Sequence, residues 1–191
     1  GNFIILNGDK VHNAAVEMNQ GILQVLSPEI EKEKIKIIFS GWIENWSGKN
    51  ASYTAGKIFE FAGVKIDAII AANDGIAGGV AEELKSRGMA EEYTITGQDG
   101  DLPACHRILN GTQTMTVYKS SKLIAYATAD LAFKIAKNEK PEGLKYRFNG
   151  RLDVPTVLLN PVIVDKSNIE STIIADGIYT MQQIMNFSNT N

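Results

Sequence analysis

Residues 66–80 read Ile-Asp-Ala-Ile-Ile-Ala-Ala-Asn-Asp-Gly-Ile-Ala-Gly-Gly-Val, and this run decides the fold. It begins with small and β-branched apolar residues, hydrophobic on both faces, which is the pattern of a strand buried in a parallel sheet. It then reaches Asn73 and Asp74, either of which can cap the helix that the next residues predict. Ligands of open parallel sheets bind beyond the carboxyl ends of the strands. Both side chains are therefore expected near a ligand, although capping alone would also explain them.

The same alternation of short apolar runs and helical patterns repeats along the chain. It predicts an α/β fold with an open parallel sheet flanked by helices. Strands are expected at 3–6, 35–39, 66–72, 94–96 and 114–119, and helices at 12–26, 50–62, 76–87 and 103–109, with 28–36 as a solvated connection. After Lys119 the pattern changes to a long amphipathic helix over 120–138, extended segments at 154–159 and 162–164, a mixed segment over 168–185 and a polar tail.

Composition narrows the function classes. The 191 residues include 19 basic and 22 acidic side chains, and no basic patch is dense enough to indicate a nucleic-acid partner. The sequence has no apolar run long enough to span a bilayer. Cys105 is the only cysteine, which excludes a disulfide framework and a Cys-based zinc site and indicates a small buried residue. No metal or cofactor is expected.

Polar side chains follow three of the expected strands. These are the amide of Asn73, the carboxylate of Asp99 and the ammonium of Lys119. Each sugar hydroxyl both donates and accepts hydrogen bonds, so this mixture of groups suits vicinal hydroxyls. A phosphate cradle would instead use Gly-rich amides with Arg or Lys. The strand ends therefore favour a sugar site.

Three segments at these strand ends carry a resemblance to a known family. They are Ala-Asn-Asp-Gly at 72–75, Gly-Gln-Asp-Gly-Asp-Leu at 97–102 and Gly-Thr-Gln-Thr-Met-Thr-Val-Tyr-Lys at 111–119. They resemble the D-xylose-binding proteins, which are type I periplasmic sugar-binding proteins of ABC transporters, and the third segment is the most specific. The resemblance extends over the whole chain but over only the later part of such a two-lobed protein. Because the chain begins directly in a strand, its front end is expected to be missing.

The resemblance also implies a domain organisation. Residues 1–118 would form the C-terminal sugar-binding lobe, and residues 145–191 would return to that lobe and end in the tail. Residues 119–144 would form the hinge crossing and a helix that belongs to the missing N-terminal lobe. Composition alone would make that helix one more helix of a single domain.

Trp46 is the aromatic candidate for the site. A pyranose presents an apolar face of C–H groups on which an indole stacks well. The alternative is a loop tryptophan that folds back on the core, for which Trp42 is the better candidate. The resemblance places the family's stacking tryptophan at Trp46 and its sugar ligands at Asn73, Asp99 and Lys119. The neighbours Asp74 and Asp101 are expected to be caps or loop residues that orient these groups.

The end of the first expected strand supplies two further candidates. The family usually has an Asp-Asn-Asn run there, whereas this chain has His12, Asn13 and then alanine. His12 and Asn13 are kept as candidate sugar-binding residues, and the departure bears on which sugar is bound. A helix cap or a surface residue is the alternative for His12.

The resemblance implies a non-catalytic protein that binds a monosaccharide, D-xylose or a related aldose, between two lobes. The closed form would deliver it to a membrane permease of an ABC transporter. One alternative is a sugar sensor that signals to a membrane histidine kinase, and another is the effector domain of a sugar-responsive repressor. A further alternative is an enzyme that uses Asp74, Asp99 or Asp101 as acid and base. Against it, the sequence contains no nucleophile–base motif and no dinucleotide-binding fingerprint. The expected location is extracytoplasmic, in the periplasm or on the cell surface as a lipoprotein.

Overall fold

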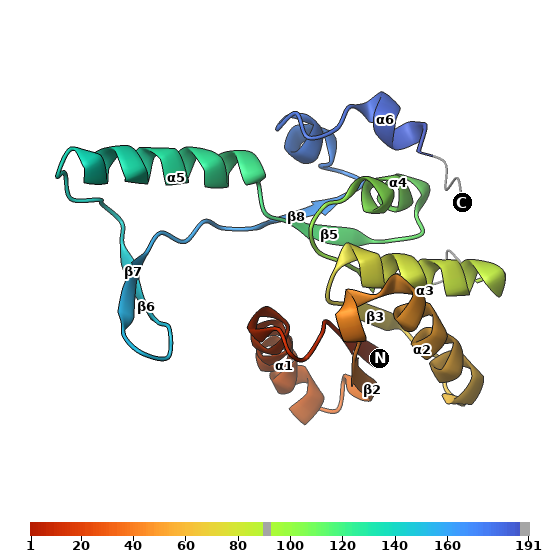
Figure 1. Cartoon of the computed structure of the whole chain (residues 1–191). Coiled ribbons are helices and arrows are strands. Elements are labelled where there is room, and N and C mark those ends of the chain that lie inside the picture. Colours follow the sequence, from red (N-terminus) through yellow and green to blue (C-terminus); the bar gives the residue numbers. More distant parts are fainter. Residues whose placement is uncertain (90–92, 188–191) are drawn as a thin grey trace. The chain divides into compact units, whose positions relative to one another are not determined.

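The computed structural model describes residues 1–89 and 93–187 (Figure 1). The chain divides into two compact units. The first comprises Gly1–Tyr118 and the chain from Ile163 onward, and the second comprises Lys119–Val162. The second unit includes the expected crossing segment, 119–144, and continues to Val162. The assignment of 119–144 to a missing lobe stays a prediction.

A four-stranded parallel sheet organises the first unit. Its strands are β1 (Asn2–Asn7), β2 (Lys36–Trp42), β3 (Ala68–Ala71) and β4 (Thr94–Thr96), in the order β2-β1-β3-β4. The two central strands are apolar on both faces, and Ile4, Ile5 and Ile69 are fully buried. The open parallel sheet expected from the strand–helix alternation is therefore confirmed.

Helices α1 (Asn13–Glu31), α2 (Gly48–Phe61), α3 (Asp74–Ser86) and α4 (Leu102–Asn110) connect the strands of the first unit. Ser47, Asn73 and Asp101 cap α2, α3 and α4, because each side chain accepts the backbone amide three residues further on. A side chain at Gly79 would collide with the backbone of Gly48, so glycine lets α2 and α3 approach closely. Helix α4 ends at Gly111, which adopts the left-handed conformation at φ 82°.

Helix α1 differs from the expectation. It does not end at Leu26 but continues through Pro28 to Glu31, so the expected exposed connection over 28–36 is wrong for its first half. Proline lacks the amide that would donate to the carbonyl of Gln24. The hydroxyl of Ser27 donates to that carbonyl at 3.2 Å and replaces the missing bond.

A second, smaller core lies beside α4. Strand β5 (Met115–Tyr118) pairs with β8 (Val162–Asp165), followed by a π-helical turn at Glu170–Ile174 and by α6 (Met181–Met185). Buried side chains from these segments pack together: Cys105, Tyr118, Val164, Ile169, Ile173 and Ile184. Cys105 is fully buried, as expected, and burial raises the pKa of its thiol to about 12.

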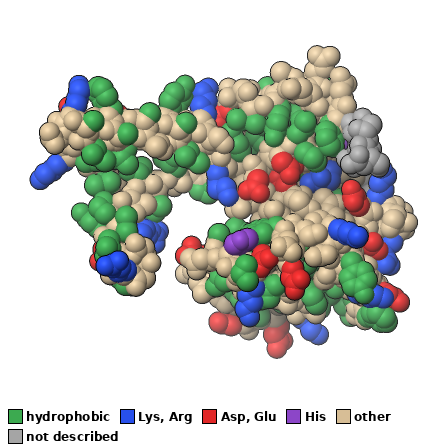
Figure 2. All heavy atoms as spheres, in the orientation of Figure 1, with side chains coloured by type: hydrophobic (Ala, Val, Ile, Leu, Met, Phe, Trp, Pro, Cys, Tyr) green, Lys and Arg blue, Asp and Glu red, His purple; other side chains and the backbone are tan. Residues whose placement is uncertain are grey.

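The second unit consists of α5 (Ser121–Ala136) and a hairpin of β6 (Lys145–Phe148) and β7 (Asp153–Thr156). Strand β6 lies in a stretch where the sequence pattern predicted no strand. The hairpin turn is closed by Asn149, whose side-chain oxygen accepts the amides of Arg151 and Leu152. Helix α5 has no buried residue, and hydrophobic side chains lie at the surface of this unit (Figure 2). In the part of the chain that the structure describes, no helix combines the length and apolarity needed to cross a membrane.

Candidate functional site

The candidate site lies along one edge of the sheet. Because β1, β2, β3 and β4 run parallel, their carboxyl ends meet at the same edge, which we call the rim. The chain after β2 forms a short 3₁₀ turn, Glu44–Trp46, and the chain after β3 begins α3 at Asn73. The chain after β4 carries Asp99. The rim therefore brings together the loops that hold Trp46, Asn73 and Asp99.

Contacts between these loops show that they are direct neighbours. Gly75 lies close to both loops. A β-carbon added to Gly75 would be 3.7 Å from the carbonyl oxygen of Trp46 and 3.6 Å from the side-chain oxygen of Asn73. On the other side, the backbone amide of Asp74 donates to the carbonyl of Gln98 at 2.8 Å. The order along the rim is thus the loop of Trp46, then the start of α3, then the loop of Asp99.

The indole of Trp46 is held by the loop after β1. It lies over Gly8, where an added side chain would collide with its six-membered ring. Its Nε1–H donates to Nδ1 of His12 at 2.7 Å, and the two rings lie edge to edge, with centroids 6.2 Å apart and planes at 24°. Trp46 also packs at the edge of the main core, while Trp42 lies beneath the ammonium of Lys10. The core contact that the sequence assigned to Trp42 is therefore made by Trp46.

Asp9 supports the backbone of the same turn. Asn45 and Trp46 adopt left-handed backbone angles of φ 56° and 55°, which are uncommon for residues other than glycine. The carboxylate of Asp9 accepts the backbone amide of Asn45 at 2.6 Å and that of Val11 at 3.0 Å. These two bonds hold the pKa of the Asp9 carboxyl below its usual value. The loop after β1 thus holds both the backbone and the side chain of the turn.

Asn73 combines two roles. Its side-chain oxygen accepts the amide of Ile76 at 2.9 Å, so Asn73, and not Asp74, is the cap of α3. A carbonyl oxygen has a second lone pair, and the side-chain NH₂ group remains a donor. Because the side-chain oxygen already bonds to Ile76, the NH₂ group is the better candidate for a hydrogen bond to a ligand.

Asp99 is exposed at the rim and has an unusual backbone conformation, φ 112°. Its amide donates to the carbonyl of Val117 at 3.0 Å, and the flanking Gln98 and Gly100 are both bonded to Asp74. A non-glycine residue with such a φ persists only where its surroundings hold it. The backbone of Asp99 is therefore held in place at the rim.

The carboxylate of Asp74 is buried directly behind the rim. It accepts the amides of Gly100 and Asp101 at 2.7 and 3.1 Å, the hydroxyl of Thr116 at 2.9 Å and the side-chain amide of Gln113 at 2.9 Å. Burial raises the pKa of the Asp74 carboxyl to about 6, against the opposing effect of these hydrogen bonds. Asp74 therefore ties α3, the loop of Asp99 and β5 together.

Sequence reasoning missed the partners of Asp74. Arg107 donates from Nε to the side-chain oxygen of Gln113 at 3.0 Å and from Nη2 to the carbonyl of Asp74 at 2.8 Å. Thr116 is fully buried and shares one face of β5 with the buried Tyr118. The sequence offered no signal for this, because alternation along β5 would place the apolar Met115 and Val117 inward, whereas the structure buries Thr116 and Tyr118.

Asn13 and Lys119 are the remaining candidates. The side chain of Asn13 donates to Glu17, one turn along α1, at 2.7 Å. Lys119 is exposed and is the first residue of the second unit. The rim thus unites Trp46, His12, Asn73 and Asp99, whereas Asn13 turns along its own helix. Within the described ranges, 1–89 and 93–187, no group of three or more His, Cys, Asp or Glu side chains is placed to hold a metal ion.

Comparison with known proteins identifies the family. The sequence profile of the periplasmic binding protein domain matches residues 1–140. The chain belongs to the periplasmic binding protein family. Among the relatives within this family, the D-xylose-binding periplasmic protein of Haemophilus influenzae is 39% identical over 184 residues, which covers 96% of this chain and 55% of that protein. The D-xylose-binding periplasmic protein of Escherichia coli K12 is 36% identical, over 96% of this chain and 56% of that protein. The resemblance seen in the sequence is therefore confirmed.

Solved structures agree with the fold. An ABC transporter solute-binding protein of Clostridium phytofermentans, solved with β-D-glucose, matches with a TM-score of 0.83 and 27% identity over 96% of this chain and 60% of that one. A carbohydrate transporter solute-binding protein of Chloroflexus aurantiacus matches with a TM-score of 0.82 at 24% identity, over 63% of that protein. At this identity the match shows a shared fold. The chain spans about half the length of the curated relatives it matches.

Proposed function

We propose that the full-length protein, meaning this chain together with the segment that supplies a second lobe, binds a monosaccharide without changing it. D-xylose or a related aldose is the proposed ligand, bound between two lobes and passed to the permease of an ABC transporter. The observation that carries the proposal is the position of Trp46, Asn73 and Asp99 on neighbouring loops of one rim. The names of the two D-xylose-binding relatives support the choice of ligand.

The three groups have complementary chemistry for such a ligand. The indole of Trp46 offers an apolar face for the C–H groups of a pyranose. Asn73 offers a donor, and Asp99 offers an ionised acceptor, which makes stronger hydrogen bonds than a neutral one. In this proposal Lys119, which follows β5 directly, contributes an ammonium from the hinge. The proposed location is the periplasm or, as a lipoprotein, the cell surface.

A sensory role is the second candidate. A relative from Rhizobium radiobacter that is 27% identical over 96% of this chain is described as a multiple sugar-binding periplasmic receptor. In that role the sugar-bound form would engage a membrane histidine kinase in place of a permease. Sugar binding is common to both roles, so transport and signalling assays of a strain that lacks the protein separate them.

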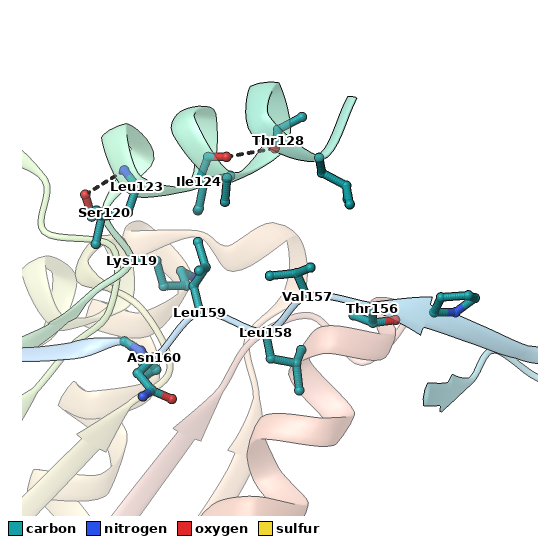
Figure 3. Close-up of a pocket in the computed structure, with 14 residues that line it drawn as sticks. Lys119, Ser120, Leu123, Ile124, Thr128, Thr156, Val157, Leu158, Leu159 and Asn160 are labelled. Carbon is teal, nitrogen blue, oxygen red and sulfur yellow. Dashed lines mark hydrogen bonds between the residues drawn. The ribbon is translucent and has the colours of Figure 1, made fainter. Parts of the chain in front are cut away.

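The second unit supports the proposed two-lobed protein. An apolar groove of about 400 Å³ lies within this unit, between α5 and residues 155–161 (Figure 3). It is lined by Leu123, Ile124, Leu158 and Leu159, which are 42–51% exposed. A helix with so much exposed apolar surface requires a partner to cover it. We propose that the N-terminal lobe, which the missing half of the relatives' length would supply, covers this groove.

Calorimetry of the full-length protein tests the proposal. The wild type should release heat with D-xylose, and Asp99→Asn should bind on the order of 10- to 100-fold more weakly, because a hydrogen bond to a charged group contributes about 1.5–3 kcal/mol. Glu31→Gln is the matched control, since Glu31 is exposed at the opposite end of α1 from the rim. Equal affinities of wild type and Asp99→Asn would count against the site. A sugar product after long incubation would favour an enzyme.

A further inference from the structure

We infer that His12 is a positioning residue for the indole of Trp46, and that it sets monosaccharide affinity through that indole and not as a direct ligand. The inference rests on the proposed function, in which Trp46 stacks on the sugar. The observation behind it is the direct bond between the two side chains.

The chemistry of this bond fixes the state of the imidazole. An indole N–H is only a donor, so Nδ1 of His12, 2.7 Å away, must accept and carries no proton. The ring is therefore the neutral tautomer with its proton on Nε2. A doubly protonated imidazole would present a proton to the indole N–H and could not make this bond.

The backbone of the turn shows why the indole needs support. Asn45 and Trp46 both adopt left-handed angles, and the Asp9 carboxylate fixes the first of them through the amide of Asn45. The side chain of Trp46 is then fixed from two directions, by Gly8 beneath the ring and by His12 at its nitrogen. An aromatic ring already held in its binding orientation loses less conformational freedom when a ligand arrives.

The structure also indicates that His12 can be replaced without unfolding the protein. His12 is exposed and precedes α1, and its side chain makes no capping hydrogen bond to that helix. A change in affinity on substitution is thus a local effect. His12→Phe keeps a flat ring beside the indole but removes the acceptor. His12→Asn restores an acceptor, because the asparagine amide oxygen reaches about as far from the backbone as Nδ1 of histidine.

A double-mutant cycle in the full-length protein separates positioning from direct contact. We expect His12→Phe to weaken D-xylose binding about 5- to 10-fold in the wild-type background, as the loss of one hydrogen bond implies. His12→Asn should recover most of this loss. In a Trp46→Phe background, which has no indole N–H, His12→Phe should have no further effect. The imidazole nitrogen shifts in an NMR spectrum should show the Nε2–H tautomer in the wild type and a change in Trp46→Phe.

The outcomes distinguish this inference from the proposed function. If the wild type binds no monosaccharide, the proposed function fails and the inference fails with it. If the wild type binds and the losses from His12→Phe and Trp46→Phe add in full, His12 contacts the sugar directly and only the inference is overturned. An unchanged affinity in His12→Phe, or a protonated Nδ1, overturns it as well. Non-additive losses with recovery in His12→Asn support it.

Discussion

The carboxylate of Asp74 accepts the backbone amide of Gly100 at 2.7 Å, and this bond joins the start of α3 to the loop after β4. The backbone amide of Asp74 bonds in turn to the carbonyl of Gln98. Asp99 lies between these two attachment points, and Asn73 is the residue before Asp74. One buried carboxylate therefore fixes the spacing between Asn73 and Asp99, the two proposed sugar-binding residues on either side of it.

Asp74→Asn should destabilise the protein by roughly 1–3 kcal/mol, because it leaves buried groups unsatisfied. The new amide NH₂ would face either the NH₂ of Gln113 or the backbone amides of Gly100 and Asp101, and all of these are donors. Gln113 cannot rotate to accept, since its oxygen already binds Arg107. Urea unfolding measures the loss. Asp130→Asn, at an exposed ion pair on α5, is the control and should change stability by less than about 1 kcal/mol. Equal losses from both would contradict the role of Asp74.

The stability of the wild type relative to Asp74→Asn should depend on pH. The pKa of Asp74 is about 6 in the folded protein, against 3.8 as the ordinary value, so the folded state holds this proton more tightly than the unfolded state. Stability from this group is therefore present at low pH and is lost as pH rises through 6. Between pH 7 and pH 5 the advantage of the wild type should grow by on the order of 1 kcal/mol. Unfolding curves at both pH values test this, and a constant or shrinking difference would argue against it.

Gly8→Ala should displace the indole of Trp46, because the added methyl group would occupy the position of its ring. We expect weaker D-xylose binding in the full-length protein and a shifted Trp46 fluorescence in a Trp42→Phe background. Gly21→Ala is the matched control, since nothing lies within 4 Å of a methyl group at Gly21 in α1. That control should leave affinity unchanged and raise stability by about 0.5–1 kcal/mol. A Gly8→Ala protein with wild-type affinity and fluorescence would show that the indole does not need this position.

The sequence predicted the order of strands and helices from β1 to α5 because apolar periodicity is a local property. It also predicted the capping role of Asn73 or Asp74 from their place between a strand and a helix. It could not predict that α1 passes Pro28, because this depends on the hydroxyl of Ser27 replacing one lost bond. The contact between His12 and Trp46 was equally hidden, since it joins loops 34 positions apart that meet only when the sheet forms.

The buried network around Asp74 could be predicted only in part from the sequence. The segment 111–119 resembles a family signature, but its sequence did not identify Asp74 as the hydrogen-bond partner of Gln113 and Thr116. These contacts span 39 and 42 positions. Alternation along β5 would place Met115 and Val117 inward, so the burial of Thr116 became visible only in the structure.

Helix α5 should be covered in the full-length protein and open in the chain alone. Its side chains include Leu123, Tyr126 and Phe133, each at least half exposed, and no residue of the helix is buried. A helix without tertiary packing exchanges its amide protons quickly. Hydrogen exchange over 121–136 should therefore be markedly slower in the full-length protein, while α3, with seven buried residues, should be slow in both. Equal exchange rates of α5 in the two proteins would mean that no second lobe packs on it, and the apolar groove beside α5 would then need a different partner.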